Sequence, residues 1–419
     1  MNPPAASGAA SPALAPATSP ERRRFWSALV RPLLARLATP FYLFSVTPVR
    51  QALAELDAWF GHLPVRHWFS CKTQPLRPLL RWWRGQGRPV EVVSEFEFLA
   101  ARAEGFPPEQ ILVNGPAKHH WLPRHAVPGL SVNLDSAAEA RALAPLARRL
   151  GWRLGLRLNP AEEFDPESPG HPTQFGLTPA EALPVLRDLR RHGRAPEILH
   201  FHLRTNVAVV RCYERALREA AAFCAAAGWR PRFVDCGGGW PPPGVRDRAG
   251  HPLDAQFDWD ALRRLLERAR GWFPDVEEFW LENGRWLTAR SGVLVVTVRD
   301  VKERRGLRHL ICDGGRTLHA LVSLWEQHEL FTLPARRGPA VLTGVTGPTC
   351  MAFDQLARRP LPRGLRAGDR LVWLDAGAYH LAWETRFSHG LAAVAWHDGR
   401  RLRVVRRAEL FANWWAQWG

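Results

Sequence analysis

The stretch VRHWFSCKTQPLRPLLRWWRGQG (residues 65–87) contains the unit from which most of this chain is built. A short apolar run over 65–71 predicts a strand, and the segment 75–87 that follows predicts a helix. Short apolar strands that alternate with helices indicate a parallel α/β fold, and eight of them predict a closed (β/α)8 TIM barrel, with an open doubly wound sheet as the alternative. We expect the eight strands in the segments 65–71, 90–94, 110–115, 130–135, 153–160, 197–203, 231–239 and 278–285.

The character of the sequence changes after the last of these units. Beyond residue 290, β runs separated by Gly and Asp turns predict a C-terminal, mainly β domain over 291–419, which leaves the barrel at 49–290. An early strand, FYLFSV, lies within residues 25–48, and we expect it to join the β domain. Residues 1–24 are rich in Pro, Ala and Ser and predict a disordered leader rather than a signal peptide, because the arginines follow the apolar part.

Composition restricts the classes of function. The 419 residues carry a net charge of +17, but the arginines are spread along the chain and accompany no nucleic-acid motif. We therefore expect no nucleic-acid partner, and a basic nucleic-acid or membrane-surface binder remains an alternative. No run of 18 or more apolar residues predicts a membrane span. The six cysteines form no CxxC pair and no metal-like spacing to histidine, which disfavours a zinc site and fits reduced thiols in a cytoplasmic protein.

Lysine is rare in this chain. Of the 57 lysines and arginines, only three are lysines: Lys72, Lys118 and Lys302. Arginine stays protonated, whereas a buried lysine can lose its proton and attack a carbonyl. Lys72, at the end of the first expected barrel strand, is therefore a candidate covalent residue. The alternative is an exposed charge at a strand end.

The other barrel strands also end in residues suited to chemistry, and the active site of such a barrel lies at these ends. His200 and His202 stand two residues apart in the sixth strand. His202 could stack on a flat ring. The two histidines could also bind a metal ion, but the sequence shows no third ligand for it. Gly237 to Gly239 could admit a phosphate at a helix N-terminus. Glu282 could hold a pyridine nitrogen protonated and Arg285 could bind the phosphate, or the two could pair with each other.

These motifs, in this order, resemble those of the fold-type III decarboxylases that use pyridoxal 5'-phosphate (PLP). That family includes ornithine, arginine and diaminopimelate decarboxylases and is more distantly related to alanine racemase. The resemblance spans roughly residues 38 to 400 and implies a PLP-binding TIM barrel followed by a mainly β domain. The segments that carry it are FSCKTQ, VEVVSEFEF, ILVNGPAK, LHFHLRT, DCGGGWP, ENGR, VTGPTCMAFD and DAGAYHLAWETRFSHG.

The resemblance implies a role for each matching residue. Lys72 corresponds to the Schiff-base lysine, His202 to the residue that lies over the cofactor ring, and Cys350 to the acid that protonates the product. In this family the cysteine comes from the partner subunit, which implies a homodimer with shared active sites. The cofactor contacts implied by the motifs are Lys72, His202, Thr205, Gly237, Gly238, Gly239, Glu282, Gly284, Arg285 and Tyr379.

The expected reaction is the decarboxylation of an amino acid. Asp354, Met351 and Arg204 are the candidate substrate residues. Met351 stands where related enzymes for diamino acids commonly carry an acidic residue, and Arg204 replaces a glycine, so we expect a modified amino acid of a specialised or siderophore-like pathway. The alternatives are a PLP-dependent racemase or epimerase, against which Cys350 argues, and a non-catalytic regulatory paralogue, which usually loses the cofactor residues.

Overall fold

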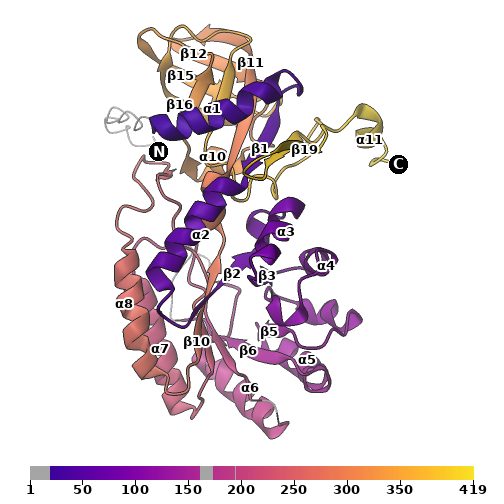
Figure 1. Cartoon of the computed structure of the whole chain (residues 1–419), viewed down its shortest axis with the longest axis vertical. Helices are drawn as coiled ribbons and strands as arrows, with labels where there is room; N and C mark the ends of the chain where they lie inside the picture. The colour runs from indigo at the N-terminus through magenta and orange to yellow at the C-terminus, as the bar shows by residue number, and fades with distance from the viewer. Residues whose placement is uncertain (1–18, 161–172, 194) are drawn as a thin grey trace, which may run out of the picture.

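The computed structural model describes residues 19–160, 173–193 and 195–419. It contains a barrel, in the lower part of Figure 1, and a sheet domain above it. The helix α2 (Val46–Phe60) runs from one part to the other in this view. None of the helices in the described part of the chain has the length and apolar character needed to cross a membrane.

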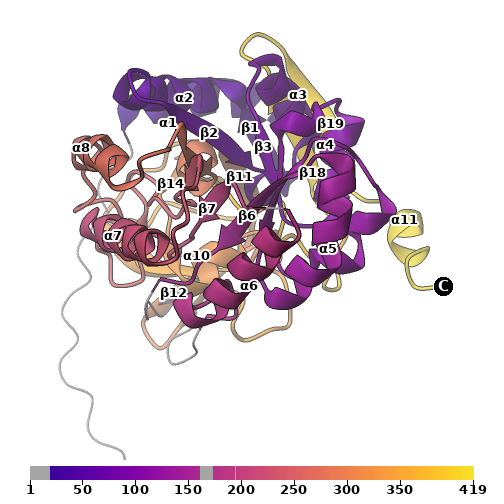
Figure 2. The same ribbon diagram turned by 90° about the horizontal axis from the view of Figure 1, so that it is seen from below.

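Eight parallel strands close the barrel in the order β10-β2-β3-β4-β5-β6-β7-β8. They lie within the eight segments expected from the sequence, so the TIM barrel is confirmed and the open sheet is excluded. Helices surround these strands in Figure 2. The strands are β2 (Val65–Ser70), β3 (Val90–Val92), β4 (Ile111–Val113), β5 (Ser131–Leu134), β6 (Arg153–Arg157), β7 (Ile198–His200), β8 (Phe233–Asp235) and β10 (Glu278–Asn283).

The barrel helices begin where polar side chains cap them. Ser94, Ser136 and Asp258 each accept a hydrogen bond from a backbone N–H of the first turn that follows, and Thr178 forms a reciprocal capping box with Glu181. The apolar faces of the helices then pack on the strands in one continuous core. The helices after α2 are α3 (Arg77–Gly85), α4 (Glu95–Ala103), α5 (Ala137–Leu150), α6 (Pro179–Arg191), α7 (Arg211–Ala226), α8 (Trp259–Ala269) and α9 (Arg285–Thr288).

The second part of the chain is a nine-stranded sheet that includes one strand from the N-terminal segment. β1 (Phe41–Ser45) lies between β11 and β18, antiparallel to the first and parallel to the second. The remaining strands of this sheet are β11 (Gly292–Arg304), β12 (Leu307–Cys312), β14 (Leu330–Leu333), β15 (Ala340–Thr346), β16 (Gln355–Pro362), β17 (Arg370–Trp373), β18 (Ala393–His397) and β19 (Leu402–Arg406). β9 (Arg246–Asp247) pairs separately with β13 (Glu326–Gln327), and two short helices, α10 (Ala320–Leu324) and α11 (Phe411–Trp415), complete the described elements.

The helix at the N-terminal end of the described chain was not expected from the sequence. α1 (Pro20–Leu34) begins inside the stretch interpreted as a disordered leader, so that interpretation is wrong for residues 20 to 24. Trp26, Val30 and Leu33 lie on one face of α1 and are buried against the sheet of the β domain, which explains why the segment is helical. Residues 1–18 lie outside the described part of the chain.

Candidate active site

Lys72, in the short turn directly after β2, lies at the rim of the barrel. The Nζ atom of Lys72 is 3.0 Å from Oε1 and 2.9 Å from Oε2 of Glu91, the central residue of β3. The Lys72 side chain is 33% exposed, whereas that of Glu91 is only 1% exposed. Burial lowers the pKa of Lys72, but Glu91 and Glu282 outweigh it and raise the pKa above its usual value. Lys72 is thus an accessible ammonium that faces carboxylates.

Glu282, on β10, lies at the centre of the buried groups. It accepts a hydrogen bond from Nδ2 of Asn114, and its two oxygens lie 3.4 Å from Nε2 of His200 and 3.5 Å from Nδ1 of His202. Burial alone would raise the pKa of Glu282, but the two histidines and Lys72 hold it below its usual value. Burial also lowers the pKa of His200 well below normal, against the pull of Glu282. The carboxylate of Glu282 therefore stays ionised.

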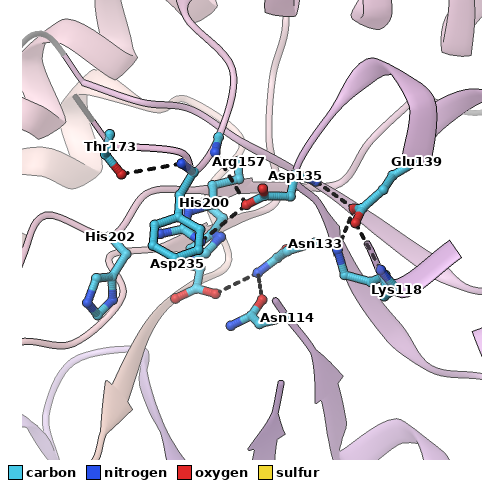
Figure 3. Close-up of polar contacts among 12 residues, drawn as sticks. Asn114, Lys118, Asn133, Asp135, Glu139, Arg157, Thr173, His200, His202 and Asp235 are labelled. Atoms are coloured by element: carbon cyan, nitrogen blue, oxygen red, sulfur yellow. Dashed lines mark hydrogen bonds and ion pairs between the residues drawn. The ribbon is translucent and has the colours of Figure 1, made fainter. Parts of the chain in front are cut away.

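A second carboxyl group lies behind Glu282. Asp235 ends β8, is fully buried, and accepts hydrogen bonds from Nδ2 of Asn133 at 3.0 Å and from the backbone N–H of Gly237 at 3.1 Å. Burial and the neighbouring Glu282 raise its pKa well above normal, so Asp235 holds its proton. Asn133 also donates to Asn114, and Figure 3 shows it between Asn114 and Asp235. Amide side chains thus link the two carboxyl groups across the barrel.

This grouping brings together carboxyl groups that the sequence left apart. We found no third metal ligand near the two histidines, yet His200, Asp235 and Glu282 have ligand atoms within 4.8 Å of one another. The additional groups come from β8, which pairs with the strand of His200, and from β10, which pairs with β8 on its other side.

The glycine loop after β8 is packed closely against its neighbours. A Cβ on Gly238 would lie 2.3 Å from the carbonyl oxygen of Glu282, and one on Gly239 would lie 2.0 Å from that of Arg204. Gly237 and Gly239 also have φ angles of +65° and +98°, which favour glycine. The N–H of Gly238 donates to Nδ1 of His202 at 3.1 Å, which fixes the ring of that half-buried histidine. These three glycines therefore hold the strand ends together.

Arg285 does not pair with Glu282. Its guanidinium forms an ion pair with the buried Glu326 and lies over the ring of Tyr379, 4.9 Å from the ring centroid. Burial raises the pKa of Glu326, but Arg285 and His328 outweigh it and lower the pKa to about 2. The N–H of Tyr379 in turn donates to the carbonyl oxygen of Thr73, next to Lys72, at 2.7 Å. The β domain thus contributes residues to the rim of the barrel.

The segment around Cys350 lies between β15 and β16. Cys350 is exposed, and Met351 lines an open surface pocket together with Arg316, Trp383 and Phe387.

The carboxylate of Asp354, which we expected among the substrate residues, binds backbone groups of the protein. Its side chain is 2% exposed and accepts hydrogen bonds from the backbone N–H groups of Arg316 at 2.7 Å and Thr349 at 3.1 Å. The carboxylate is therefore occupied in holding the loop that carries Cys350.

Two expected residues follow β7. Arg204 and Thr205 are both half-buried. The Nε atom of Arg204 is buried, so this side chain does not extend freely into solvent. Gly284, after β10, is buried, and a Cβ there would lie 2.5 Å from Cγ2 of Thr73. Gly284 thus allows the segment after β10 to approach the turn that carries Lys72.

Several polar residues of the site were missed in the sequence. Glu91, Asn114, Asn133 and Asp235 are all buried and come from four different strands or strand ends. The signal was a single polar residue within or directly after an apolar strand, as in VEV and ILVN. Such a residue must point into the barrel or towards its rim, where only other polar groups can satisfy it.

These groups fit PLP. An accessible amine at Lys72 can bond to an aldehyde, the ionised Glu282 can accept a hydrogen bond from a protonated ring nitrogen, and His202 offers a flat ring at the rim. Both ring nitrogens of His200 are buried without a hydrogen-bond partner, which leaves polar capacity at the base of the site.

Comparisons with known proteins agree with this chemistry. The profile of the family described as "Pyridoxal-dependent decarboxylase, pyridoxal binding domain" matches residues 48–289. A diaminopimelate decarboxylase of Actinosynnema pretiosum subsp. auranticum is 31% identical over 399 residues, which cover 90% of this chain and 88% of the relative. The diaminopimelate decarboxylase of Deinococcus radiodurans is 29% identical over 394 residues, or 91% of this chain and 96% of the relative.

Solved structures share the fold. A crystal structure of diaminopimelate decarboxylase from Helicobacter pylori complexed with L-lysine has a TM-score of 0.80 at 21% identity and covers 93% of this chain and 98% of that one. The arginine decarboxylase of Paramecium bursaria Chlorella virus bound to agmatine has a TM-score of 0.73 at 18% identity, with coverage of 88% and 99%.

Proposed function

The chain belongs to the pyridoxal-dependent decarboxylases and is an amino-acid carboxy-lyase with PLP as cofactor, and we propose that Lys72 binds this cofactor covalently while Cys350 returns a proton to the product. The observation that carries the assignment of Lys72 is its amine, partly exposed at the rim between Glu91 and Glu282. When bound, PLP supplies an electron sink for the electron pair released as CO2 leaves.

The three carboxyl groups near Lys72 have different proposed roles. Glu91 lies 2.9 Å from its Nζ and holds the ammonium in place whenever the amine is not bonded to the cofactor. Glu282 faces the ring side of the site, and its lowered pKa keeps it able to accept a proton in a hydrogen bond. Asp235, whose pKa is raised, stays neutral and adds no repulsion to Glu282.

The acid is proposed to come from a second copy of the chain. Cys350 is exposed in the single chain, and the neighbouring Phe353 is 56% exposed. An exposed large apolar side chain beside a thiol is suited to burial against another protomer. We infer a homodimer in which Cys350 of one subunit protonates the product held by Lys72 of the other.

The substrate is proposed to be an amino acid whose distal end carries no free ammonium that needs an ion pair. Met351 is apolar where related enzymes commonly place an acidic residue, and it lines an open pocket with Arg316. Glu384 also lines this pocket, but its oxygens are bound by Arg406 and by the backbone N–H of Ala392, so it is not free to pair with a distal ammonium. A modified amino acid with a carboxylate or an acylated distal end fits this surrounding, with Arg204 as a further positive charge after β7.

The absorption spectrum of the PLP-loaded protein tests the covalent role. We expect a visible band from the lysine-bound cofactor in the wild type and in Lys118→Met, and its loss in Lys72→Ala. A Lys72→Ala protein that kept the band and released CO2 would rule out the assignment. If the band appeared in no variant, including the wild type, the chain would be a regulatory paralogue.

Mixing inactive subunits tests the shared site. Lys72→Ala and Cys350→Ala proteins, each inactive alone, should together regain about a quarter of wild-type activity, because about half of randomly reassociated dimers carry one intact site. No recovery in dimers shown by mass to be mixed would contradict the proposal.

A substrate panel with CO2 release as the readout tests the specificity. We expect lysine, ornithine and meso-diaminopimelate, which all carry a free distal ammonium, to be poorer substrates than analogues whose distal end has an acylated amine or a carboxylate without an ammonium. A preference for meso-diaminopimelate would overturn this part of the proposal, and chiral analysis of recovered substrate would detect racemase activity.

A further inference from the structure

We propose that His319, His328 and His380 form a binding site for one divalent transition-metal ion, with zinc as the preferred ion. The three residues lie in the β domain: His319 directly before α10, His328 between β13 and β14, and His380 directly after Tyr379. All three are at least 98% buried, and one ligand nitrogen of each lies within 4.8 Å of the others. This site lies beside Arg285 and Tyr379, which are expected to contact PLP, but it does not depend on the assignment of Lys72.

Two of the three imidazoles have ring nitrogens without partners. The Nδ1–H of His380 donates to the carbonyl oxygen of Ala378 at 2.8 Å, which leaves the lone pair of Nε2 unprotonated and buried with no hydrogen bond. His319 is fully buried, and neither of its ring nitrogens has a partner. Buried polar atoms without partners are uncommon and costly. A cation at the centre of the cluster would satisfy both residues.

The third imidazole, His328, has partners at both ring nitrogens, so a metal ion would have to replace or share the contact of its Nε2 with Glu326. Nδ1 of His328 donates to the carbonyl oxygen of Leu374 at 3.0 Å, and Nε2 lies 2.8 Å from Oε2 of Glu326. Histidines that bind metals commonly donate their other N–H to a backbone carbonyl, which fixes the tautomer and the ring. His328 and His380 both have this arrangement.

The spacing of the rings suits a tetrahedral ion. Their centroids are separated by 4.4 Å, 5.2 Å and 5.3 Å. Three imidazoles bound to zinc at about 2.0–2.1 Å, roughly tetrahedrally arranged, would place their centroids about 5 Å apart. The ring separations are therefore close to those of a three-histidine zinc site.

Charge and ligand type favour a transition metal over calcium or magnesium. Imidazole nitrogen suits zinc, copper, iron and nickel, whereas calcium and magnesium prefer oxygen. Glu326 brings a carboxylate to the edge of the cluster, and its other oxygen is bound by Arg285. Arg285 and Arg359 both act against a cation near this cluster, so we expect binding to depend on the charge of Glu326.

The cysteine pattern of the sequence gave no indication of this site. We disfavoured zinc because no cysteine lies at a metal-like spacing, but these ligands are all histidines from three separate segments. The ion would join α10, the β13–β14 turn and the segment of Tyr379, whose backbone contacts Thr73 beside Lys72.

The metal content of the full-length, PLP-loaded protein is the first test. Elemental analysis after dialysis should find about one zinc per chain in the wild type and in Lys72→Ala. We expect at least a tenfold lower content in His319→Ala and His380→Ala, and a reduced content in Glu326→Gln. His251→Ala, which removes an exposed histidine outside the cluster, should bind as the wild type does.

A second measurement does not require any cluster variant to fold. Wild-type protein stripped with a chelator should melt at a lower temperature, regain its Tm with added zinc, and give the visible spectrum of tetrahedral cobalt when Co2+ is added instead. A stripped wild type that neither changes its Tm with zinc nor gives this cobalt spectrum would overturn the proposal. Loss of the PLP band with normal metal content would instead count against the proposed function alone.

Discussion

Two lysine–glutamate pairs in the barrel have the same chemical groups and different surroundings. Lys118 pairs with Glu139 at side-chain exposures of 0% and 1%, while Lys72 pairs with Glu91 at 33% and 1%. Figure 3 shows the Lys118 pair to one side of the polar groups around His200 and Asp235. Glu139 also accepts hydrogen bonds from the backbone N–H groups of Asp135 and Lys118. The charged groups of this pair are therefore bound within the protein and do not face solvent.

As a result, the pKa values of the two lysines are shifted in opposite directions. For Lys118, burial is the largest effect and lowers the pKa, and Glu139 only partly restores it. For Lys72, burial also lowers the pKa, but Glu91 and Glu282 together raise it above normal. The difference teaches that access to solvent, rather than the residue type or the direction of the pKa shift, separates the structural lysine from the one that a ligand can reach.

Replacing each lysine should separate the two roles most clearly. We expect Lys72→Ala to lower the rate of CO2 release at least about a thousandfold, or about 4 kcal/mol in activation free energy, because the covalent attachment of the cofactor is lost. Lys118→Met, assayed at a temperature where it is folded, should keep the rate within about tenfold. Equal losses of kcat in the two folded proteins would remove the distinction.

Stability should show the reverse order. Lys118→Met leaves the buried carboxylate of Glu139 without its ammonium, which we expect to cost about 3–5 kcal/mol in the free energy of unfolding. The double variant Lys118→Met/Glu139→Gln should recover part of this loss, since glutamine removes the charge and its one carbonyl oxygen can still accept one of the two backbone hydrogen bonds. Urea unfolding monitored by tryptophan fluorescence measures both, and no recovery in the double variant would show that repacking, rather than charge, causes the loss.

A substitution can remove one of the carboxylates that face Lys72. Glu91→Gln removes the closest negative charge, so the pKa of Lys72 should fall, by about one unit or more. The pH dependence of the rate at which the PLP-free protein regains its visible band should therefore shift to lower pH. Glu139→Gln is the matched control and should leave that profile unchanged. An unshifted Glu91→Gln profile would mean that Glu91 only positions the amine.

The smallest expected effect concerns Glu97, a further carboxyl group on the Lys72 side. Burial raises its pKa to about 7, with a further contribution from Glu91. The fold therefore favours the protonated form, and its contribution to stability is lost as pH rises from the usual pKa of a glutamate through about 7. Glutamine at this position imitates the protonated acid and still accepts the N–H of Val93.

Thermal unfolding of Glu97→Gln checks this sign. The Tm of the variant relative to the wild type should increase between about pH 5 and pH 8, by on the order of 1–2 °C. A constant difference across this range would show that Glu97 does not titrate there.

The sequence by itself determined the barrel and part of its site. The alternation of apolar strands and helices is a local property, so each unit could be recognised separately and eight of them counted. Lys72, His202 and Glu282 could be named because each stands at or near the end of a strand within a recognisable motif. The helix α1 was missed because its short apolar face, with Trp26 and Val30, follows directly on a stretch of disordered composition.

Only the tertiary structure decided which polar groups meet. Glu91, Asn114, Asn133 and Asp235 come from different strands, and closure of the barrel directs them to one point, where each must find a partner because water is excluded. Sequence spacing likewise left Glu282 as a partner for Arg285, whereas the folded β domain brings Glu326 to it. Local patterns determine the elements, but pKa values and ion pairs depend on through-space distances and burial, which exist only once the chain has folded.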